Sequence, residues 1–137
     1  MALKVILDSN FLFIPVQFHV DVLEELERVA GQRVEPILFS PVYTELKAIA
    51  SKEGKGHRQA VAALKYAEGL KCVDVEARPT EAVDDLILRL ACEWGLPVAT
   101  NDRVLRKRLR DAKVTVIYLR QRSHLEIYGS ISNNGSL

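Results

Sequence analysis

The sequence predicts an α/β fold of three layers, in which a central, mostly parallel and twisted sheet of about five strands lies between helices. Short apolar runs alternate along the chain with segments whose apolar residues recur at helical spacing. Strands and helices that alternate in this way form parallel sheets covered by helices on both faces. The length of 137 residues fits one domain, and the apolar share of 48% is enough to build a core.

The first part of the chain predicts a strand, a helix and a second strand. The apolar run Leu3–Leu7 is typical of a short buried strand. Apolar residues at helical spacing predict a helix over Val20–Ala30, and Gly31 ends it. The run Pro36–Phe39 is again short and apolar, and it predicts the second strand.

The middle of the chain predicts two helices and a third strand. Ser40 and Pro41 mark a helix start, with serine as the N-cap and proline at the first helical position. This helix extends to about Ser51. A second helix follows over His57–Gly69, and the run Leu70–Val75 predicts the third strand.

The last part of the chain repeats the alternation. A long helix is expected over Glu81–Trp94, where Gly95 stops it. A fourth strand over Pro97–Ala99, a helix over Asp102–Asp111 and a fifth strand over Val114–Leu119 complete the predicted sheet.

We expect one domain over residues 1–128 and a flexible tail over residues 129–137, where the sequence is polar and contains glycine. No apolar run reaches the ~18–20 residues of a membrane span, and the N-terminus does not resemble a signal peptide. Cys72 and Cys92 lie in apolar runs without metal-ligand spacing. They predict reduced, buried cysteines in a cytoplasmic protein.

The formal net charge of +1 conceals an uneven distribution of charge. Residues 103–122 carry eight basic side chains and one acid, Asp111, whereas most acids lie earlier in the chain. A basic stretch of this kind predicts a polyanionic partner, which leaves the acids free for another role.

Two acids stand where a carboxylate is energetically unfavourable. Asp8 directly follows the first strand, at the edge where open α/β sheets bind their ligands. Its alternative role is that of a turn residue. Glu45 falls within the apolar stripe of its helix, where a buried carboxylate needs a partner, a proton or a metal. Alternatively, its side chain reaches solvent or pairs with a lysine.

Two further acids lie near helix starts. Asp84 shares a helix face with apolar residues such as Ile87, whereas Asp85 is rotated by about 100° to the edge of that face. Asp84 is therefore the better ligand candidate, although the helix dipole alone favours an acid in the first turn. Asp102 follows the fourth strand, where a plain N-cap is the simpler interpretation.

In a parallel sheet these four acids share one edge, where they repel one another unless cations neutralise them. A ligand set of oxygen atoms suits Mg²⁺ or Mn²⁺ and does not suit zinc. One or two such ions serve phosphate chemistry. The sequence therefore predicts an acidic metal site built from Asp8, Glu45, Asp84 and Asp102.

Four short motifs occur in a fixed order along the chain: Asp8-Ser9-Asn10, Glu45-Leu46, Asp84-Asp85-Leu86-Ile87 and Thr100-Asn101-Asp102. In this order and at these spacings the chain resembles the PIN domain family, the fold of many metal-dependent RNA nucleases. The resemblance extends to about Arg120. Each motif alone is weak, and the ordered set is more specific.

The resemblance implies an endoribonuclease that hydrolyses RNA phosphodiester bonds with one or two Mg²⁺ or Mn²⁺ ions. Asp8, Glu45 and Asp84 would form the main metal shell, and Asp102 would be a fourth acid that often acts through water. Asn10 and Thr100 resemble the polar support residues of the family, and Asp85 would support the site from behind.

RNA is the partner that the basic residues would contact. On the last helix the candidates are Arg103, Arg106, Lys107 and Arg110, and on the glycine-bearing loop they are Lys52, Lys55 and Arg58. For any single arginine, a solvated helix face is the alternative interpretation.

Three roles remain open within the resemblance. The C-terminal half is more similar to rRNA-processing PIN nucleases, which favours an archaeal member of that kind. The alternative is a VapC-type toxin of a toxin–antitoxin pair, which the size of the chain fits. A catalytically silent RNA-binding or scaffold module is the third, and the presence of all four acids argues against it. The partner beyond RNA would be an antitoxin or a ribosome-assembly factor. The apolar segment Phe11–Ile14 indicates either a homodimer contact or core.

Overall fold

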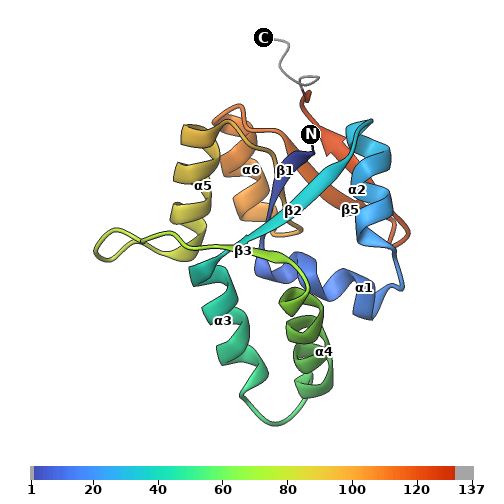
Figure 1. The fold of residues 1–137 in the computed structure, drawn as a ribbon, viewed down its shortest axis with the longest axis vertical. Helices are drawn as coiled ribbons and strands as arrows, with labels where there is room; N and C mark the ends of the chain where they lie inside the picture. Colours follow the sequence, from blue (N-terminus) through green and yellow to red (C-terminus); the bar gives the residue numbers. More distant parts are fainter. Residues whose placement is uncertain (1, 132–137) are drawn as a thin grey trace.

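In the computed structural model the described chain, residues 2–131, forms one six-stranded sheet with helices around it (Figure 1). The strands are β1 (Leu3–Leu7), β2 (Val34–Phe39), β3 (Lys71–Val73), β4 (Val98–Ala99), β5 (Val116–Arg120) and β6 (His124–Tyr128). The helices are the 3-10 helix η1 (Ser9–Phe13), α1 (Ile14–Gln17), α2 (Val22–Ala30), α3 (Ser40–Ala50), α4 (His57–Glu68), α5 (Val83–Trp94) and α6 (Arg103–Asp111).

The strand order is β3-β2-β1-β4-β5-β6, and each neighbouring pair from β3 to β5 is parallel. Helices α5 and α6 lie on one side of the sheet and α2 on the other (Figure 1). Beyond the lower end of the sheet, α3 and α4 form a helical hairpin (Figure 1). The predicted three-layer fold is confirmed, with six strands instead of about five.

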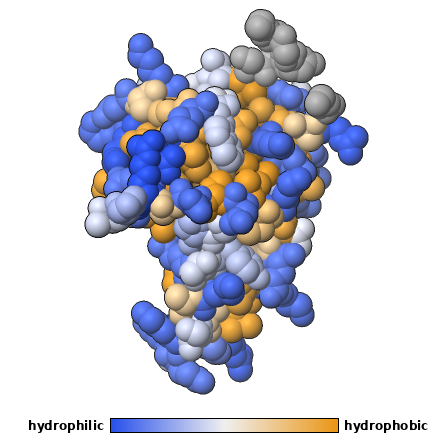
Figure 2. Space-filling view, turned by 60° about the vertical axis from the view of Figure 1, so that its left-hand side comes forward, coloured by the Kyte–Doolittle hydropathy of each residue, from blue (hydrophilic) through white to orange (hydrophobic). Residues whose placement is uncertain are grey.

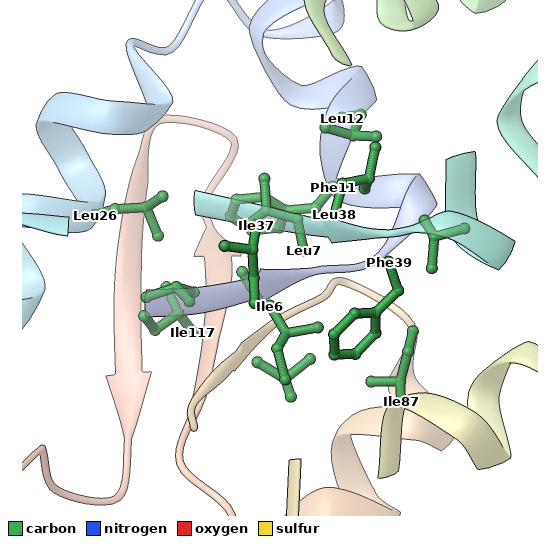
Figure 3. Packing of buried hydrophobic residues seen from close by; sticks show 14 of the residues in the cluster. Ile6, Leu7, Phe11, Leu12, Leu26, Ile37, Leu38, Phe39, Ile87 and Ile117 are labelled. Carbon is green, nitrogen blue, oxygen red and sulfur yellow. The ribbon is translucent and has the colours of Figure 1, made fainter. Parts of the chain in front are cut away.

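The core fills the space between the sheet and its helices. Side chains of β1 and β2 such as Ile6 and Ile37 are fully buried. Phe39 at the end of β2 lies next to Ile87 of α5 (Figure 3). The two faces of the central strands are therefore both apolar, as expected for a parallel sheet covered on both sides.

The segment after β1 was open to two interpretations, and the structure assigns it to the core. Phe11 and Leu12 are completely buried, and Ile14 is 1% exposed. Asp8 caps η1 by accepting a hydrogen bond from the Ser9 amide. The apolar run therefore indicates packing within the chain and gives no support to a homodimer contact.

Two helix starts differ from the prediction in detail. The helix expected from Val20 begins at Val22, because Asp21 caps it by accepting a bond from the Glu24 amide. Ser40 is the first residue of α3 instead of its N-cap. Its hydroxyl bonds both backbone groups of Val75, at 3.1 Å and 3.2 Å, and so ties α3 to the segment after β3.

The strand β6 is absent from the sequence prediction. It pairs antiparallel with β5, and the chain turns between them with positive φ angles of 54° at Gln121 and 60° at Arg122. Tight hairpin turns with such angles usually carry glycine or asparagine, so the usual turn signal is missing here. The expected tail over residues 129–137 lies largely outside the described residues.

The two cysteines contradict the prediction of buried side chains. Both are free thiols and both are exposed. Cys72 lies on β3, which is an edge strand and so has a neighbour on one side alone. Cys92 is exposed on α5. Trp94 is 43% exposed, and its ring packs edge-to-face on the buried Phe39, with the ring centroids 5.4 Å apart. Among residues 2–131, no helix is long and apolar enough to cross a membrane.

Helix α2 covers the outer edge of β6. The Leu125 amide donates to Glu25 Oε1 at 2.9 Å, and Arg28 Nη2 donates to the Leu125 carbonyl oxygen at 2.8 Å. Glu25 and Arg28 also form an ion pair at 2.9 Å. Side chains thus replace the strand that an exposed edge lacks, which protects it from pairing with another chain.

Replacing Glu25 with glutamine should destabilise the fold at neutral pH by about 1 kcal/mol, because a charge-assisted hydrogen bond pair is weakened. The hydrogen bond from Arg28, helped by the Leu125 amide, lowers the pKa of Glu25 below its usual 4.5. This stabilisation is present above pH 4.5 and is lost as the pH falls through the lower folded-state value. Urea melts of wild type and Glu25→Gln at pH 7 and pH 3 measure it.

The exposed neighbour Glu24 on the same helix provides the control, and Glu24→Gln should change stability little. A loss in Glu25→Gln that is equally large at pH 3 would show that the ionised carboxylate is not its source.

Candidate active site

The strand order reverses direction at β1 and β4, whose carboxyl ends lie side by side. From β1 the chain moves outward to β2 and β3, and it then returns to the other side of β1 as β4. In open α/β sheets, ligands bind where the order reverses in this way. Asp8 directly follows β1 and Thr100 directly follows β4, so these two residues face each other across that point.

Asp8 is held by three donors. Thr100 Oγ1 donates to its Oδ2 at 2.8 Å, Asn10 Nδ2 donates to the same oxygen at 3.1 Å, and the Ser9 amide donates to its Oδ1 at 2.8 Å. Asp8 is 3% exposed and Thr100 is completely buried. A carboxylate that is buried and bonded on both oxygens keeps one orientation.

The turn after β4 joins this network to two other elements. The Asp102 amide donates to Thr100 Oγ1 at 3.1 Å, and the Asn101 amide donates to Asn10 Oδ1 at 3.1 Å. Asn101 Oδ1 accepts from the Leu119 amide at 2.9 Å and so anchors the turn to β5. Asn101 was not singled out by the sequence, although its place between Thr100 and Asp102 was visible there.

Glu45 approaches the same edge from α3. It is half-buried, and its Oε1 accepts a hydrogen bond from Ser9 Oγ at 2.9 Å. Val42 and Leu46 on this helix are buried, whereas Ile49 is 40% exposed, so the apolar stripe is narrower than predicted. Ser9 is a further site residue that sequence reasoning missed, because a serine in a turn gives no signal of its own.

Asp84 and Asp85 differ as the helix geometry suggested. Asp84 is half-buried in the first turn of α5. The site acids Asp102 and Glu45 are among the charged residues close enough to affect its pKa. Asp85 forms an ion pair with Arg108 at 2.7 Å, which connects α5 to α6. Asp102 is the N-cap of α6, and its Oδ1 accepts from the Val104 and Leu105 amides.

Burial and mutual repulsion show in the pKa values of the acids. Burial raises the pKa of Asp8 to about 6, and the charges of Asp84 and Glu45 add to the rise, against the hydrogen bonds from Thr100 and Ser9. Burial also raises the pKa of Asp84, followed by repulsion from Asp102 and Glu45. The four carboxylates therefore share one electrostatic environment.

This oxygen-rich donor set fits a hard divalent cation in chemistry. A carboxylate offers about four acceptor positions, and the three donors to Asp8 leave one on Oδ1. Asp102 uses Oδ1 for capping and retains Oδ2. Within residues 2–131, however, no three acidic, histidine or cysteine side chains are grouped closely enough to hold a metal as they stand. Binding would therefore require rotation of the half-buried acids.

The basic residues fall on two separate surfaces. Those of α6 line a groove between this helix and the β5–β6 hairpin, namely Arg103, Arg106, Lys107 and Arg110. Lys52, Lys55 and Arg58 are exposed in and next to the loop between α3 and α4, at the far end of the helical hairpin (Figure 1). None of the four site acids lines this groove, and its lining residue next to them in the sequence is Arg103, which directly follows Asp102.

Comparison with models of known protein families shows to which family the chain belongs. The model of a family described as "PIN like domain" matches residues 5–122, which include all four acids. The chain belongs to the PIN-like domain family. Ribonuclease VapC4 of Methanocaldococcus jannaschii is 30% identical over 132 residues, which cover 93% of this chain and 98% of that protein.

Two solved structures share the PIN fold. The structure of the PIN domain endonuclease Utp24 has a TM-score of 0.76 at 22% identity, and the match covers 94% of this chain and 96% of that one. A domain of a functionally unknown protein from Methanocaldococcus jannaschii has a TM-score of 0.61 at 16% identity, covering 99% of this chain and 98% of that one. At these identities the structures establish the fold alone.

Asp8→Asn should stabilise this PIN domain in the absence of divalent cations, because it removes a charge that burial and neighbouring acids disfavour. The pKa rise from 3.8 to about 6 corresponds to at most ~3 kcal/mol, and imperfect hydrogen bonding by the amide reduces the expected gain to about 1–2 kcal/mol. The ionised form destabilises the fold fully above pH 6 and no longer does so below pH 3.8.

Thermal melts with EDTA at pH 8 and pH 4 test this expectation, with the exposed Asp74→Asn as the control. The gain should appear at pH 8 and vanish at pH 4. A less stable Asp8→Asn at pH 8 would mean that the three hydrogen bonds to the carboxylate outweigh its burial.

Proposed function

We propose that the protein is a divalent-metal-dependent endoribonuclease that hydrolyses RNA phosphodiester bonds. The observation that carries this proposal is the meeting of the site acids at the β1/β4 switch point, where a buried aspartate has a raised pKa. Carboxyl groups with perturbed pKa values that gather at one place are typical of catalytic sites. The name of the 30% identical relative, Ribonuclease VapC4, agrees with RNA as the substrate.

Asp8, Glu45, Asp84 and Asp102 would hold one or two Mg²⁺ or Mn²⁺ ions. Such an ion, when bound, supplies an activated water at neutral pH and charge stabilisation for the leaving oxygen. Thr100 and Asn10 keep the Asp8 carboxylate in one orientation through their bonds to Oδ2. The Asp85–Arg108 ion pair holds the start of α5 against α6 and so limits where Asp84 can lie.

Positive charge next to the acids would bring the substrate in. Arg103, Arg106, Lys107 and Arg110 follow the site along α6, and each phosphate contact adds salt-sensitive affinity without sequence preference. Lys52, Lys55 and Arg58 on the α3–α4 loop would be a second, more distant contact.

Of the biological roles, a VapC-type toxin of a toxin–antitoxin pair is favoured by the full-length similarity to Ribonuclease VapC4. The rRNA-processing role rests on the resemblance of the C-terminal half of the chain, from Asp84 to Arg122, to nucleases of that kind. In the toxin role, induced expression of wild type should arrest growth of a host cell, Asp8→Asn should not, and a neighbouring antitoxin should restore growth. Growth that continues with active enzyme would favour the processing role.

Cleavage of a labelled single-stranded RNA with Mn²⁺ or Mg²⁺ tests the enzyme directly. Asp8→Asn and Glu45→Gln should each lower the rate by at least about 100-fold, since even groups behind metal ligands contribute 10–100-fold. The exposed acid Asp74 gives the matched control, and Asp74→Asn should retain the wild-type rate.

EDTA should abolish wild-type cleavage, and added Mn²⁺ should restore it. Cleavage that survives Asp8→Asn would remove this residue from the catalytic site. RNA binding without cleavage under every metal condition would identify the chain as a non-catalytic RNA-binding module.

A further inference from the structure

A groove of about 410 Å³ lies between α6 and the β5–β6 hairpin, outside the carboxylate site. Its helix wall carries Arg103, Arg106, Lys107 and Arg110, which recur at the three- and four-residue spacing of one helix face. The opposite side of α6 buries Leu105 and Leu109. Hydrophilic side chains gather on the side of the molecule that α5 and α6 bring forward, with apolar ones between them (Figure 2).

The floor of the groove is aromatic. Val116, Tyr118 and Arg120 stand two residues apart along β5, so they share one face of the sheet, and all three line the groove. Tyr128 enters the same groove from β6, where it pairs in register with Val116. Arg106 lies over the Tyr118 ring with its guanidinium carbon 4.7 Å from the centroid, and Arg110 lies 4.0 Å from the Tyr128 centroid.

Most of the positive charge in the groove is uncompensated. Lys107 is neutralised by Asp111 at 2.9 Å, and Arg120 lies 3.7 Å from Glu126. Across residues 2–131, no carboxylate lies within salt-bridge distance of Arg103, Arg106 or Arg110. In addition, Arg106 Nε is buried without a hydrogen-bond partner, which is unusual for a charged donor.

We propose that this groove is a binding site for one nucleotide of single-stranded RNA, with its phosphate between Arg106 and Arg110 and its base stacked on the Tyr128–Arg110 platform. The proposal rests on the proposed function, because it names where the substrate lies beyond the cleaved bond. Pockets of ~300–1,000 Å³ hold small organic ligands, so the volume suits one nucleotide. Aromatic rings and arginine planes stack bases, a contact that an acidic peptide would leave unused.

The position of the groove separates it from the chemistry. Arg103 to Arg110 spans seven helical steps, or about 10 Å along α6, away from the Asp102 end. A nucleotide held near Arg110 and Tyr128 is therefore not one of the two nucleotides that flank the phosphodiester bond cleaved at the carboxylates. The groove should contribute to substrate affinity, and hence to KM, while kcat depends on the acids.

Fluorescence anisotropy of a labelled single-stranded oligouridine measures RNA binding to the groove. EDTA is present and all variants carry Asp8→Asn, so that the RNA is not cleaved. Adding Arg106→Gln and Arg110→Gln should weaken binding by at least about tenfold and reduce the salt slope by about 0.7, the value for the one phosphate that both arginines contact. Tyr128→Leu should weaken binding by about 5-fold to 100-fold through loss of stacking, and Tyr128→Phe should retain it.

Lys65→Gln on α4 removes one positive charge, as each single arginine substitution does, from an exposed helix position outside the groove, and it should leave binding unchanged. Equal losses in Lys65→Gln and in the double arginine variant would overturn the proposal. So would a poly-glutamate peptide that competes as well as the RNA while Tyr128→Leu has no effect, since the groove would then be a site for an acidic protein segment. Far-UV circular dichroism melts confirm that each variant is folded.

The same variants in the catalytically competent chain keep the two proposals apart. With the groove disabled, RNA cleavage should show a raised KM and an unchanged kcat. A chain that binds RNA through Arg106, Arg110 and Tyr128 but never cleaves it would refute the nuclease and leave the groove standing. A chain that cleaves RNA with unchanged KM after these substitutions would refute the groove alone.

Discussion

The hydrogen bond between Thr100 Oγ1 and Asp8 Oδ2 joins the carboxyl ends of β1 and β4, which are the two strands at the centre of the sheet. It allows a carboxylate to remain at 3% exposure, because a buried charge is tolerated where fixed donors replace water. The other contacts of the site follow from it. Asn10 bonds the same carboxylate, and the Asp102 amide donates to the same threonine hydroxyl, so β1, β4, η1 and α6 share one network.

The buried and mutually repelling acids around Asp8 lower the stability of the fold at the place where the proposed function needs them. Asp8 has a pKa raised by burial and by neighbouring acids, so the fold retains charges that repel one another. An ordinary core would place apolar side chains there, as it does at Leu7 and Ala99 one residue earlier on each strand. The repulsion is confined to one place, where the hydrogen bonds to Asp8 fix its carboxylate and Glu45, Asp84 and Asp102 are half-buried.

Sequence patterns predicted the elements whose signals are local. The apolar run Leu3–Leu7 coincides with β1, and Gly95 ends α5 with a φ of 66° that glycine adopts readily. The sequence analysis did not predict features that depend on contacts between distant parts of the chain. β6 forms because it pairs with β5 and because Glu25 and Arg28 of α2 satisfy its outer edge. Cys72 is exposed because β3 lies at the edge of the sheet, and no periodicity in three residues reveals that place.

Glu45 and Asp84 were predicted because each interrupts an apolar helix face, and Asp8 because it follows a strand. Ser9 and Asn101 lie within the same motifs, but their hydrogen bonds depend on contacts that the sequence does not show. The basic groove shows the same division, since the spacing of the α6 arginines can be read from the sequence but the tyrosines beneath them cannot. The net charge of +1 therefore describes neither the acidic edge of the sheet nor the basic groove. Acids gathered at the sheet edge would repel RNA, and the unpaired arginines that begin one residue after Asp102 offset this repulsion along one direction. In the proposed nuclease, that asymmetry would give the RNA a defined path away from the carboxylates.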